Sequence, residues 1–292
     1  MNQALVHLLQ WLDLESVPGS DSLPVFRGAG PGGTRRRLFG GHVAAQALVA
    51  AQRAAPGALA HSFHLYFLRL GDPHTPIDYR VERLRDGRSY SARLVRAVQH
   101  DQEILVASAS FVQPEQPGLE HQICAPEVPP PAACMSWEAW AGPRLAEMSE
   151  KTRAQYLRER PIEIRPIDPI DARCPEKGAP TQAFWLRAPA EPGQLSDDPR
   201  LHQALAAYAS DHTLLSAVLR PHGVTFMSRG VMAASVDHTI WFHRPFRMDQ
   251  WLLYAQTSPI AFAGRGLALG HFFDERGDLV ASMAQEGVVR QH

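Results

Sequence analysis

The pattern of apolar and polar positions divides the chain into two halves with the same order of elements. The first 17 residues predict an amphipathic helix, and the proline-free, Ala-rich stretch 40–55 predicts a helix buried over much of its surface. Four apolar runs after it predict strands at 59–70, 77–84, 89–98 and 104–112. Between the second and third runs, Asp86-Gly87 predicts a hairpin, because glycine accepts the positive backbone angles of a tight turn.

Proline interrupts this pattern in the middle of the chain. Six prolines fall between Pro114 and Pro131, too many for packed regular structure, and a polar segment from Trp137 to Arg158 then predicts a helix. Beyond it we expect strands at 162–167 and 183–187, helix at 198–209 and 211–220, and four strands to the end. We therefore divide the chain into an N-terminal domain with its leading helix (1–114), a linker with a helix (115–159) and a C-terminal domain (160–292).

Two short matches indicate that the two domains are duplicates. Tyr66-Phe67-Leu68-Arg69 resembles Trp241-Phe242-His243-Arg244 at an offset of 175, and Leu-Val-Ala-Ser recurs at 105–108 and 279–282, an offset of 174. The predicted fold class is α+β, a double hot-dog in which each of two tandem domains is a long helix wrapped by an antiparallel β-sheet. Because free sheet edges invite aggregation, we expect the two sheets to pair edge to edge.

Composition narrows the classes of partner. With 29 basic and 30 acidic residues the formal net charge is -1, so no overall field attracts nucleic acid or an anionic membrane, and we expect neither as a partner. No apolar run is long enough for a membrane span. The odd cysteine count, without metal-ligand spacing, and the lack of a signal-peptide pattern predict a cytoplasmic protein.

Several motifs are weak as functional signals. Residues 28–33 match G-x-G-x-x-G, but no helix pattern follows and Pro31 removes a backbone donor, so we expect a loop and no dinucleotide site. His61 and His64 would face opposite sides of a strand, which argues against a metal site. Arg83, Arg85, Arg88 and Arg93 flank the Asp86 hairpin, where they would either meet phosphates or form salt bridges in solvent.

Asp211 is the most informative single position. It lies between two apolar helical runs, where a buried carboxylate costs several kcal/mol unless it is paired or hydrogen-bonded. Aspartate also begins helices well, so a helix N-cap and a catalytic carboxylate both remain open, and the two roles are compatible. On the residues alone, Ser235 is typical of a small residue in a packed strand and Gln285 of a surface position.

The chain resembles acyl-CoA thioesterase II, a family of double hot-dog enzymes, over nearly its whole length. The resemblance rests on six blocks: LFGGHVAAQAL (38–48), HSFHLYFLR (61–69), DGRSYSAR (86–93), YASD (208–211), VDHTIWFHRPF (236–246) and AQEGVVR (284–290). It implies that Asp211, Ser235 and Gln285 are catalytic and that an acyl-CoA is hydrolysed to a free fatty acid and CoA, without metal or redox cofactor. It also implies further assembly, so we expect a homodimer or homotetramer.

The chain departs from the family pattern at two positions. Ser235 stands where the family has threonine, which keeps the hydroxyl but loses the methyl group that restrains its rotamer. His42 follows Gly40-Gly41 where glutamine is frequent, which leaves the role of position 42 open.

The implied trio suits thioester chemistry. Thiols have pKa values near about 8.5, so the leaving group needs no strong general acid and the main requirement is an oriented water. Asp211 can accept a proton from that water, and Ser235 and Gln285 can fix its position. We expect the backbone N–H groups at Gly40-Gly41 to bind the oxyanion.

Two other functions remain open. A hot-dog enoyl-CoA hydratase or dehydratase needs an Asp/His pair, for which Asp237-His238 is the candidate, although these neighbours would face opposite sides of a strand. The third possibility is a protein that binds acyl-CoA without catalysis.

Overall fold

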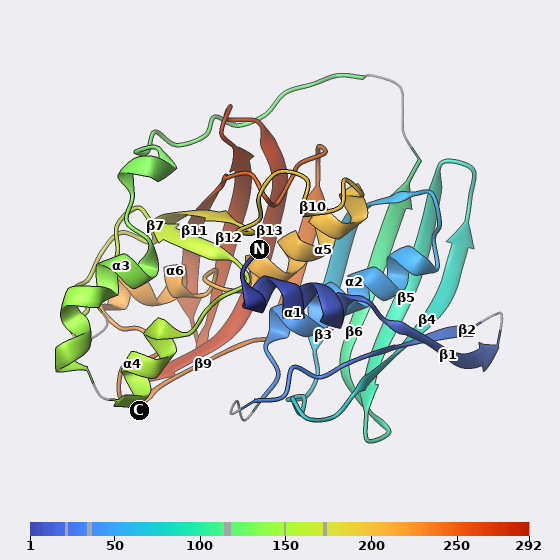
Figure 1. The fold of residues 1–292 in the computed structure, drawn as a ribbon, viewed down its shortest axis with the longest axis horizontal. Coiled ribbons are helices and arrows are strands. Elements are labelled where there is room, and N and C mark those ends of the chain that lie inside the picture. The colour runs from blue at the N-terminus through green and yellow to red at the C-terminus, as the bar shows by residue number, and fades with distance from the viewer. Residues whose placement is uncertain (21–22, 34–36, 114–117, 149, 172–173, 292) are drawn as a thin grey trace.

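The computed structural model describes residues 1–292 except 21–22, 34–36, 114–117, 149, 172–173 and 292. In this described part, the strands form one continuous antiparallel sheet in the order β1-β2-β4-β5-β6-β3-β10-β13-β12-β11-β8-β7, with β9 paired to β13 (Figure 1). The strands are β1 (Glu15–Ser20), β2 (Leu23–Gly28), β3 (Leu59–Phe67), β4 (Ile77–Asp86), β5 (Tyr90–Gln99), β6 (Gln102–Val112), β7 (Glu163–Pro166), β8 (Thr181–Arg187), β9 (Val231–Ser235), β10 (Asp237–Phe242), β11 (Leu252–Phe262), β12 (Arg265–Asp274) and β13 (Leu279–Gln291).

One long helix from each half lies at the centre of the molecule. Helix α2 (Gly40–Arg53) is buried at most of its positions, as its alanine content predicts, and α5 (Pro199–Ser210) packs against it. The buried Gln52 amide donates to Gln203 Oε1 at 3.2 Å across this contact. Helix α1 (Gln3–Leu12) covers α2 with Leu5, Leu8 and Leu12 (Figure 1). The two helices and the sheet enclose one apolar core shared by both halves.

The sheets of the two halves are joined edge to edge through β3 and β10, as the sequence predicts. The antiparallel register pairs Ser62 with Trp241 and Tyr66 with Asp237. Residue 237 is equivalent to residue 62, and residue 241 to residue 66, at the offset of 175. Each pair is therefore the image of the other, and the junction has an approximate twofold axis. The sequence offset of 175 is therefore the structural offset for these strands, and the fold is a double hot-dog.

The second sequence match is displaced from the structural equivalence. Ser108 pairs with His64, whereas Ser282 pairs with Trp241, which is equivalent to Tyr66 and not to His64. Residue 239, equivalent to 64, pairs instead with Ala284, so the structural offset between β6 and β13 is 176. The identical Leu-Val-Ala-Ser segments thus lie two residues out of register, and that match was a wrong guide to the alignment.

Three predicted helices differ from those observed. The N-terminal helix ends at Leu12, and the strand β1 follows because Pro18 is tolerated at a sheet edge but not inside a helix. The linker helix is broken by Gly142-Pro143 into α3 (Trp137–Ala141), a 3₁₀ turn and α4 (Glu150–Leu157). The predicted helix at 211–220 is a series of turns that contains only the short α6 (Ser216–Leu219).

A side chain from β8 explains the turns after α5. Ser216 N–H donates to Thr213 O at 2.9 Å, a spacing of three residues, and the Gln182 amide donates to the same carbonyl at 3.1 Å. This side chain from β8 competes for the carbonyl that an α-helix would use.

The final strands number five among the described residues where we expected four, because a bend at Val236 separates β9 from β10.

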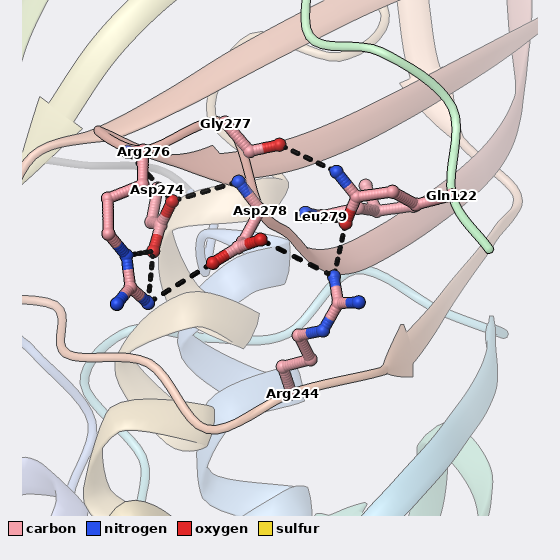
Figure 2. Close-up of polar contacts among 7 residues, drawn as sticks. All are labelled: Gln122, Arg244, Asp274, Arg276, Gly277, Asp278 and Leu279. Carbon is pink, nitrogen blue, oxygen red and sulfur yellow. Dashed lines mark hydrogen bonds and ion pairs between the residues drawn. The ribbon is translucent and has the colours of Figure 1, made fainter. Parts of the chain in front are cut away.

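Figure 2 shows one of the places where the linker is attached to the C-terminal sheet, the turn between β12 and β13. The Gln122 amide nitrogen donates to Gly277 O at 2.8 Å, and its oxygen accepts from Leu279 N–H at 3.1 Å and from the Arg244 guanidinium. Arg244 also lies 3.9 Å from the Asp278 carboxylate. The linker start at 115–117 lies outside the described residues, and the domain boundaries at 114 and 159 stay predictions.

Candidate active site

Asp211 connects the two halves of the molecule. It caps the C-terminal end of α5, and its Oδ2 accepts a hydrogen bond of 2.8 Å from Gly41 N–H in the first turn of α2. A side chain at Gly41 would place its Cβ 2.4 Å from Tyr208 O, and one at Gly40 would lie 2.7 Å from Asp211 Oδ2. Glycine at both positions is therefore required for this approach.

The predicted helix-cap role of Asp211 takes an unexpected form. The carboxylate does not begin the segment that follows it in sequence but bonds to the N-terminus of the helix from the other half. This bond uses the Gly41 N–H, one of the two backbone donors expected to bind the oxyanion. The oxyanion role of Gly40 stays a prediction.

The structure brings Asp211, Ser235 and Gln285 together. Gln285 on β13 donates from Nε2 to Asp211 Oδ1 at 2.7 Å and to Ser235 Oγ, at the end of β9, also at 2.7 Å. The Ser235 hydroxyl lies 3.5 Å from Asp211 Oδ1, a long contact. The bend at Val236 ends β9 at Ser235, whose register partner is Gly287 on the neighbouring β13.

Burial changes the acidity of this carboxylate. Removal from water raises the pKa of Asp211 to about 6, while hydrogen bonds from Gln285, Gly41 and Ser235 oppose the rise. At neutral pH the group is ionised and more basic than an ordinary aspartate. Gln285 is only 1% exposed, and its Oε1 has no hydrogen-bond partner among the described residues.

Two cavities flank Asp211. One, of about 170 Å³, contains Asp211 and Ser235 together with the side chains of Arg37 and Arg69. The other, of about 260 Å³, is lined mainly by apolar groups and reaches His212 and Thr213, the residues directly after Asp211. Its further lining includes Trp137, Ile164, Phe184, Phe226 and Met227. Nothing in the sequence spacing of Arg37 and Arg69 points to a site, so these two residues could not be predicted.

Other sequence candidates lie elsewhere. His42 is 2% exposed, contacts Ala29 O at 3.2 Å and packs its ring edge against Trp11. Arg93 is buried and bonds to Ala54 O and to Asp86, which makes it structural. The arginines of the Asp86 hairpin lie at the end of the sheet where β3 begins, whereas the 170 Å³ cavity lies at the opposite end, where β3 ends.

The remaining motifs also have local explanations. Residues 29–33, in the glycine-rich stretch, form no helix or strand. His61 contacts the Ser110 hydroxyl at 2.8 Å and His64 packs against Trp241, so the two imidazoles have different partners. No cluster of three His, Cys, Asp or Glu side chains suited to a metal occurs in the described ranges. No helix in the same part of the chain is long and apolar enough to cross a membrane.

The site and the fold match a known class of proteins. Family models for acyl-CoA thioesterase and for its N-terminal domain match residues 159–288 and 30–112. Acyl-CoA thioesterase 2 of Haemophilus influenzae is 38% identical over 291 residues, 99% of each chain. Human acyl-coenzyme A thioesterase 8 is 39% identical over 273 residues, 91% of this chain and 84% of that one.

A solved structure agrees over the whole molecule. The acyl-CoA thioesterase II of Mycobacterium marinum superposes with a TM-score of 0.76 at 36% identity and covers 98% of both chains. These similarities define a double hot-dog thioesterase. The chain belongs to the acyl-CoA thioesterase family and is a thioester hydrolase.

Proposed function

We propose that the protein hydrolyses acyl-CoA to a free fatty acid and CoA through a water that Asp211 activates and that Ser235 and Gln285 orient. The observation that carries this proposal is the hydrogen-bonded trio, in which one buried amide, Gln285, holds both the carboxylate and the hydroxyl at 2.7 Å. A carboxylate with a pKa of about 6 remains ionised near pH 7 and is a better base than ordinary aspartate.

The reaction proceeds by addition and elimination. The water oxygen attacks the thioester carbonyl carbon as Asp211 takes one of its protons, which gives a tetrahedral oxyanion. Collapse of this intermediate breaks the carbon–sulfur bond and releases CoA thiolate, which regains a proton from Asp211 or from solvent. Because the thiol has a pKa near about 8.5, the departure of sulfur needs no dedicated acid.

The free acceptor of Gln285 supports the position of the water. Its Oε1 is buried and unbonded within the described residues, and such an atom costs free energy unless something donates to it. A water held between Gln285 Oε1 and Asp211 would satisfy this acceptor while directing a proton to the carboxylate. Ser235 Oγ, 3.5 Å from Asp211 Oδ1, would limit the movement of that water.

One cavity has cationic side chains and the other an apolar lining, and the two ends of an acyl-CoA differ in the same way, with phosphates at one end and a hydrocarbon chain at the other. Arg37 and Arg69 occur beside the 170 Å³ cavity, and guanidinium groups pair well with phosphates such as those of CoA. The apolar lining of the 260 Å³ cavity suits an acyl chain, which gains from leaving water. On this arrangement the thioester lies over Asp211, between the two.

The test is a release assay with pure protein. Palmitoyl-CoA is incubated with the protein and a thiol reagent without added metal, and steady formation of free CoA over many turnovers is expected. A single bound equivalent with no release would indicate an acyl-CoA binder. Consumption of enoyl-CoA without free CoA would indicate a hydratase and would contradict the proposal.

The hydratase alternative finds no support in the geometry. Asp237 Oδ1 accepts from Glu286 N–H at 2.7 Å, while His238 is buried against Ser210, so the two side chains are committed to different partners. The chain has one fewer basic than acidic residue, so no overall positive charge attracts nucleic acid, and we propose no nucleic-acid partner.

We also propose a homodimer or homotetramer in the cytoplasm. Tyr66 and Trp241, on the joined strands β3 and β10, are 56% and 38% exposed, which leaves aromatic surface at the centre of the sheet for a second copy. The three cysteines are free thiols, as a reducing compartment allows. A light-scattering mass of one chain, 32.3 kDa, at micromolar concentration would contradict the assembly.

A further inference from the structure

The twofold relation between the halves allows the candidate site to be compared with its counterpart in the same chain. Strand register assigns Ala60 to the position of Ser235, at an offset of 175, and Ala109 to that of Gln285, at an offset of 176. The N-terminal half therefore has apolar residues at both places. Differences between the two halves indicate which residues accompany the catalytic function.

The helices can be aligned by their contacts. Gln52 of α2 reaches the backbone of Arg200 in α5, as Asp211 at the end of α5 reaches the backbone of Gly41 in α2. Asp211 follows Gln52 by 159 residues, and Arg200 follows Gly41 by the same 159. This offset assigns Gln52 to the position of Asp211 and Ala51 to that of Ser210.

A further pair of buried positions changes from apolar to polar. His238 on β10 corresponds to Phe63 on β3, and both side chains are fully buried. Ser210 and its counterpart Ala51 are also fully buried. The His238 ring nitrogen Nε2 lies 2.8 Å from Ser210 Oγ, so the two polar replacements contact each other.

The hydrogen-bond directions follow from the neighbours. Ser210 Oγ donates to Ala207 O at 3.1 Å, so it accepts from His238 Nε2–H. Burial lowers the pKa of His238 to about 3, which keeps the imidazole neutral, and its Nδ1 has no partner among the described residues. Such a group costs free energy in an apolar core, and Phe63 shows that this core accepts a hydrocarbon.

We propose that His238 and Ser210 are positioning residues, which fix the last turn of α5 so that the Asp211 carboxylate meets Gly41 and Gln285. Ser210 directly precedes Asp211, and Tyr254 Oη also donates to the Ser210 carbonyl at 2.8 Å. A displacement of about 1 Å in a catalytic group can lower a rate by about 10²-fold, so a bond that holds this turn affects turnover. The inference rests on the proposed role of Asp211.

Tyr254 itself is less informative. Its counterpart Tyr79 is present in the other half, where it donates to Gln46 Oε1 at 2.7 Å. A buried tyrosine at this position thus occurs with and without a catalytic carboxylate. The His238–Ser210 pair, in contrast, is polar only in the half that contains Asp211, Ser235 and Gln285.

The test replaces the pair by the residues of the other half. His238→Phe and Ser210→Ala are each expected to lower kcat by about tenfold or more with KM nearly unchanged. Ser210→Ala should also lower Tm, because it leaves the buried His238 Nε2–H without an acceptor, whereas in His238→Phe the Ser210 hydroxyl keeps its bond to Ala207 O. His238→Gln, which keeps a donor near the position of Nε2, should retain more of kcat. If His238→Phe fails to fold, Ser210→Ala, which changes little volume, decides the matter.

The double variant separates positioning from stability. Ser210→Ala combined with His238→Phe removes both polar groups, so Tm should recover towards that of the wild type while kcat stays low. Recovery of kcat together with Tm, or a folded single variant with full kcat, would overturn the proposal. Tyr79→Phe is the matched control, since it removes a buried hydrogen bond in the other half and should leave kcat unchanged.

The two proposals fail in different ways. If Asp211→Asn is inactive but His238→Phe turns over at the wild-type rate, the positioning role is wrong and the catalytic role of Asp211 stands. If Asp211→Asn turns over normally, the proposed function of the trio is wrong.

Discussion

Asp211 belongs to the C-terminal half, yet its Oδ2 accepts a hydrogen bond of 2.8 Å from Gly41 N–H in the helix of the N-terminal half. The carboxylate is therefore held only when α2 and α5 pack against each other. This contact explains why duplication of the fold gives one site that neither half contains alone. It also places a negative charge at the positive end of a helix, which favours the ionised form of Asp211 against the effect of burial.

Activity should depend on pH through Asp211. In the proposed mechanism the ionised carboxylate is the base. Burial raises its pKa to about 6, so kcat/KM should rise with pH through about 6 and level off above it. Gln285→Ala removes a hydrogen bond that lowers this pKa, so the inflection should move to higher pH. A rate profile of purified protein from pH 4.5 to 8.5 checks both, and an unchanged inflection in the variant would contradict the assignment.

Asp211→Asn should stabilise the folded protein above pH 6. A folded-state pKa above the unfolded value of 3.8 means that the folded state binds the proton more tightly, so stability falls as pH rises from about 4 to 6. Asparagine carries no charge and avoids this loss, which amounts to about 3 kcal/mol. Urea unfolding at pH 7.5 and pH 4 measures it, and the gain should shrink at the lower pH.

Loss of the base should dominate the kinetics of the trio. Asp211→Asn should lower kcat by about 10²-fold or more, and Ser235→Ala or Gln285→Ala by less. If all three groups act on one water, as proposed, Ser235→Ala or Gln285→Ala should add little to Asp211→Asn in a double variant. Steady-state assays of folded single and double variants decide this, and fully additive losses would contradict a shared role.

The serine position offers a finer comparison. Ser235→Thr should leave kcat unchanged or raise it slightly, because the added methyl restricts the hydroxyl to fewer rotamers. A dead Asp211→Asn with a fully active Ser235→Ala would show that the hydroxyl is dispensable here, and only Asp211 and Gln285 would then remain in the mechanism.

The apolar cavity should determine the response to acyl length. Phe226 lines it and is 49% exposed, so a bound chain would cover the ring. Phe226→Ala should raise KM for palmitoyl-CoA by about five- to tenfold, in line with the partial loss of a buried aromatic contact, and change KM for butyryl-CoA little. The control is Phe262→Ala, an exposed ring that lines neither cavity. Equal effects on both substrates would contradict the location of the acyl chain.

The strand pattern of the central sheet could be predicted from sequence, while the structure around Asp211 could not. Alternation and the Asp86-Gly87 turn located β3 to β6 within a few residues. The turns at 211–215 look helical in sequence because their composition is apolar, and only the distant Gln182 shows why Thr213 leaves the helical pattern. The contact with Gly41 joins residues 170 positions apart, and no local pattern contains it.

The trio itself came from a resemblance and not from periodicity. Ser235 and Gln285 look ordinary in their strands, because strand pattern shows which face a residue occupies and not which side chain it meets. The sequence drew attention to His238 only as half of the Asp237-His238 pair of a possible hydratase, whereas the structure pairs it with Ser210. Its comparison with Phe63 needed the strand register, which sequence offsets alone gave correctly for β10 and wrongly for β13.

The most direct test of the account is a single turnover in water enriched in the heavy oxygen isotope, with enzyme in excess over palmitoyl-CoA. If Asp211 acts as a base on water, the fatty acid formed in this first turnover carries the heavy oxygen and the protein stays unlabelled, as mass spectrometry of both would show. If instead Asp211 attacked the thioester and displaced CoA thiolate, an acyl-aspartyl anhydride would form. Its hydrolysis at the aspartyl carbonyl would give an unlabelled first fatty acid and heavy oxygen in the Asp211 carboxylate, and that result would contradict the account.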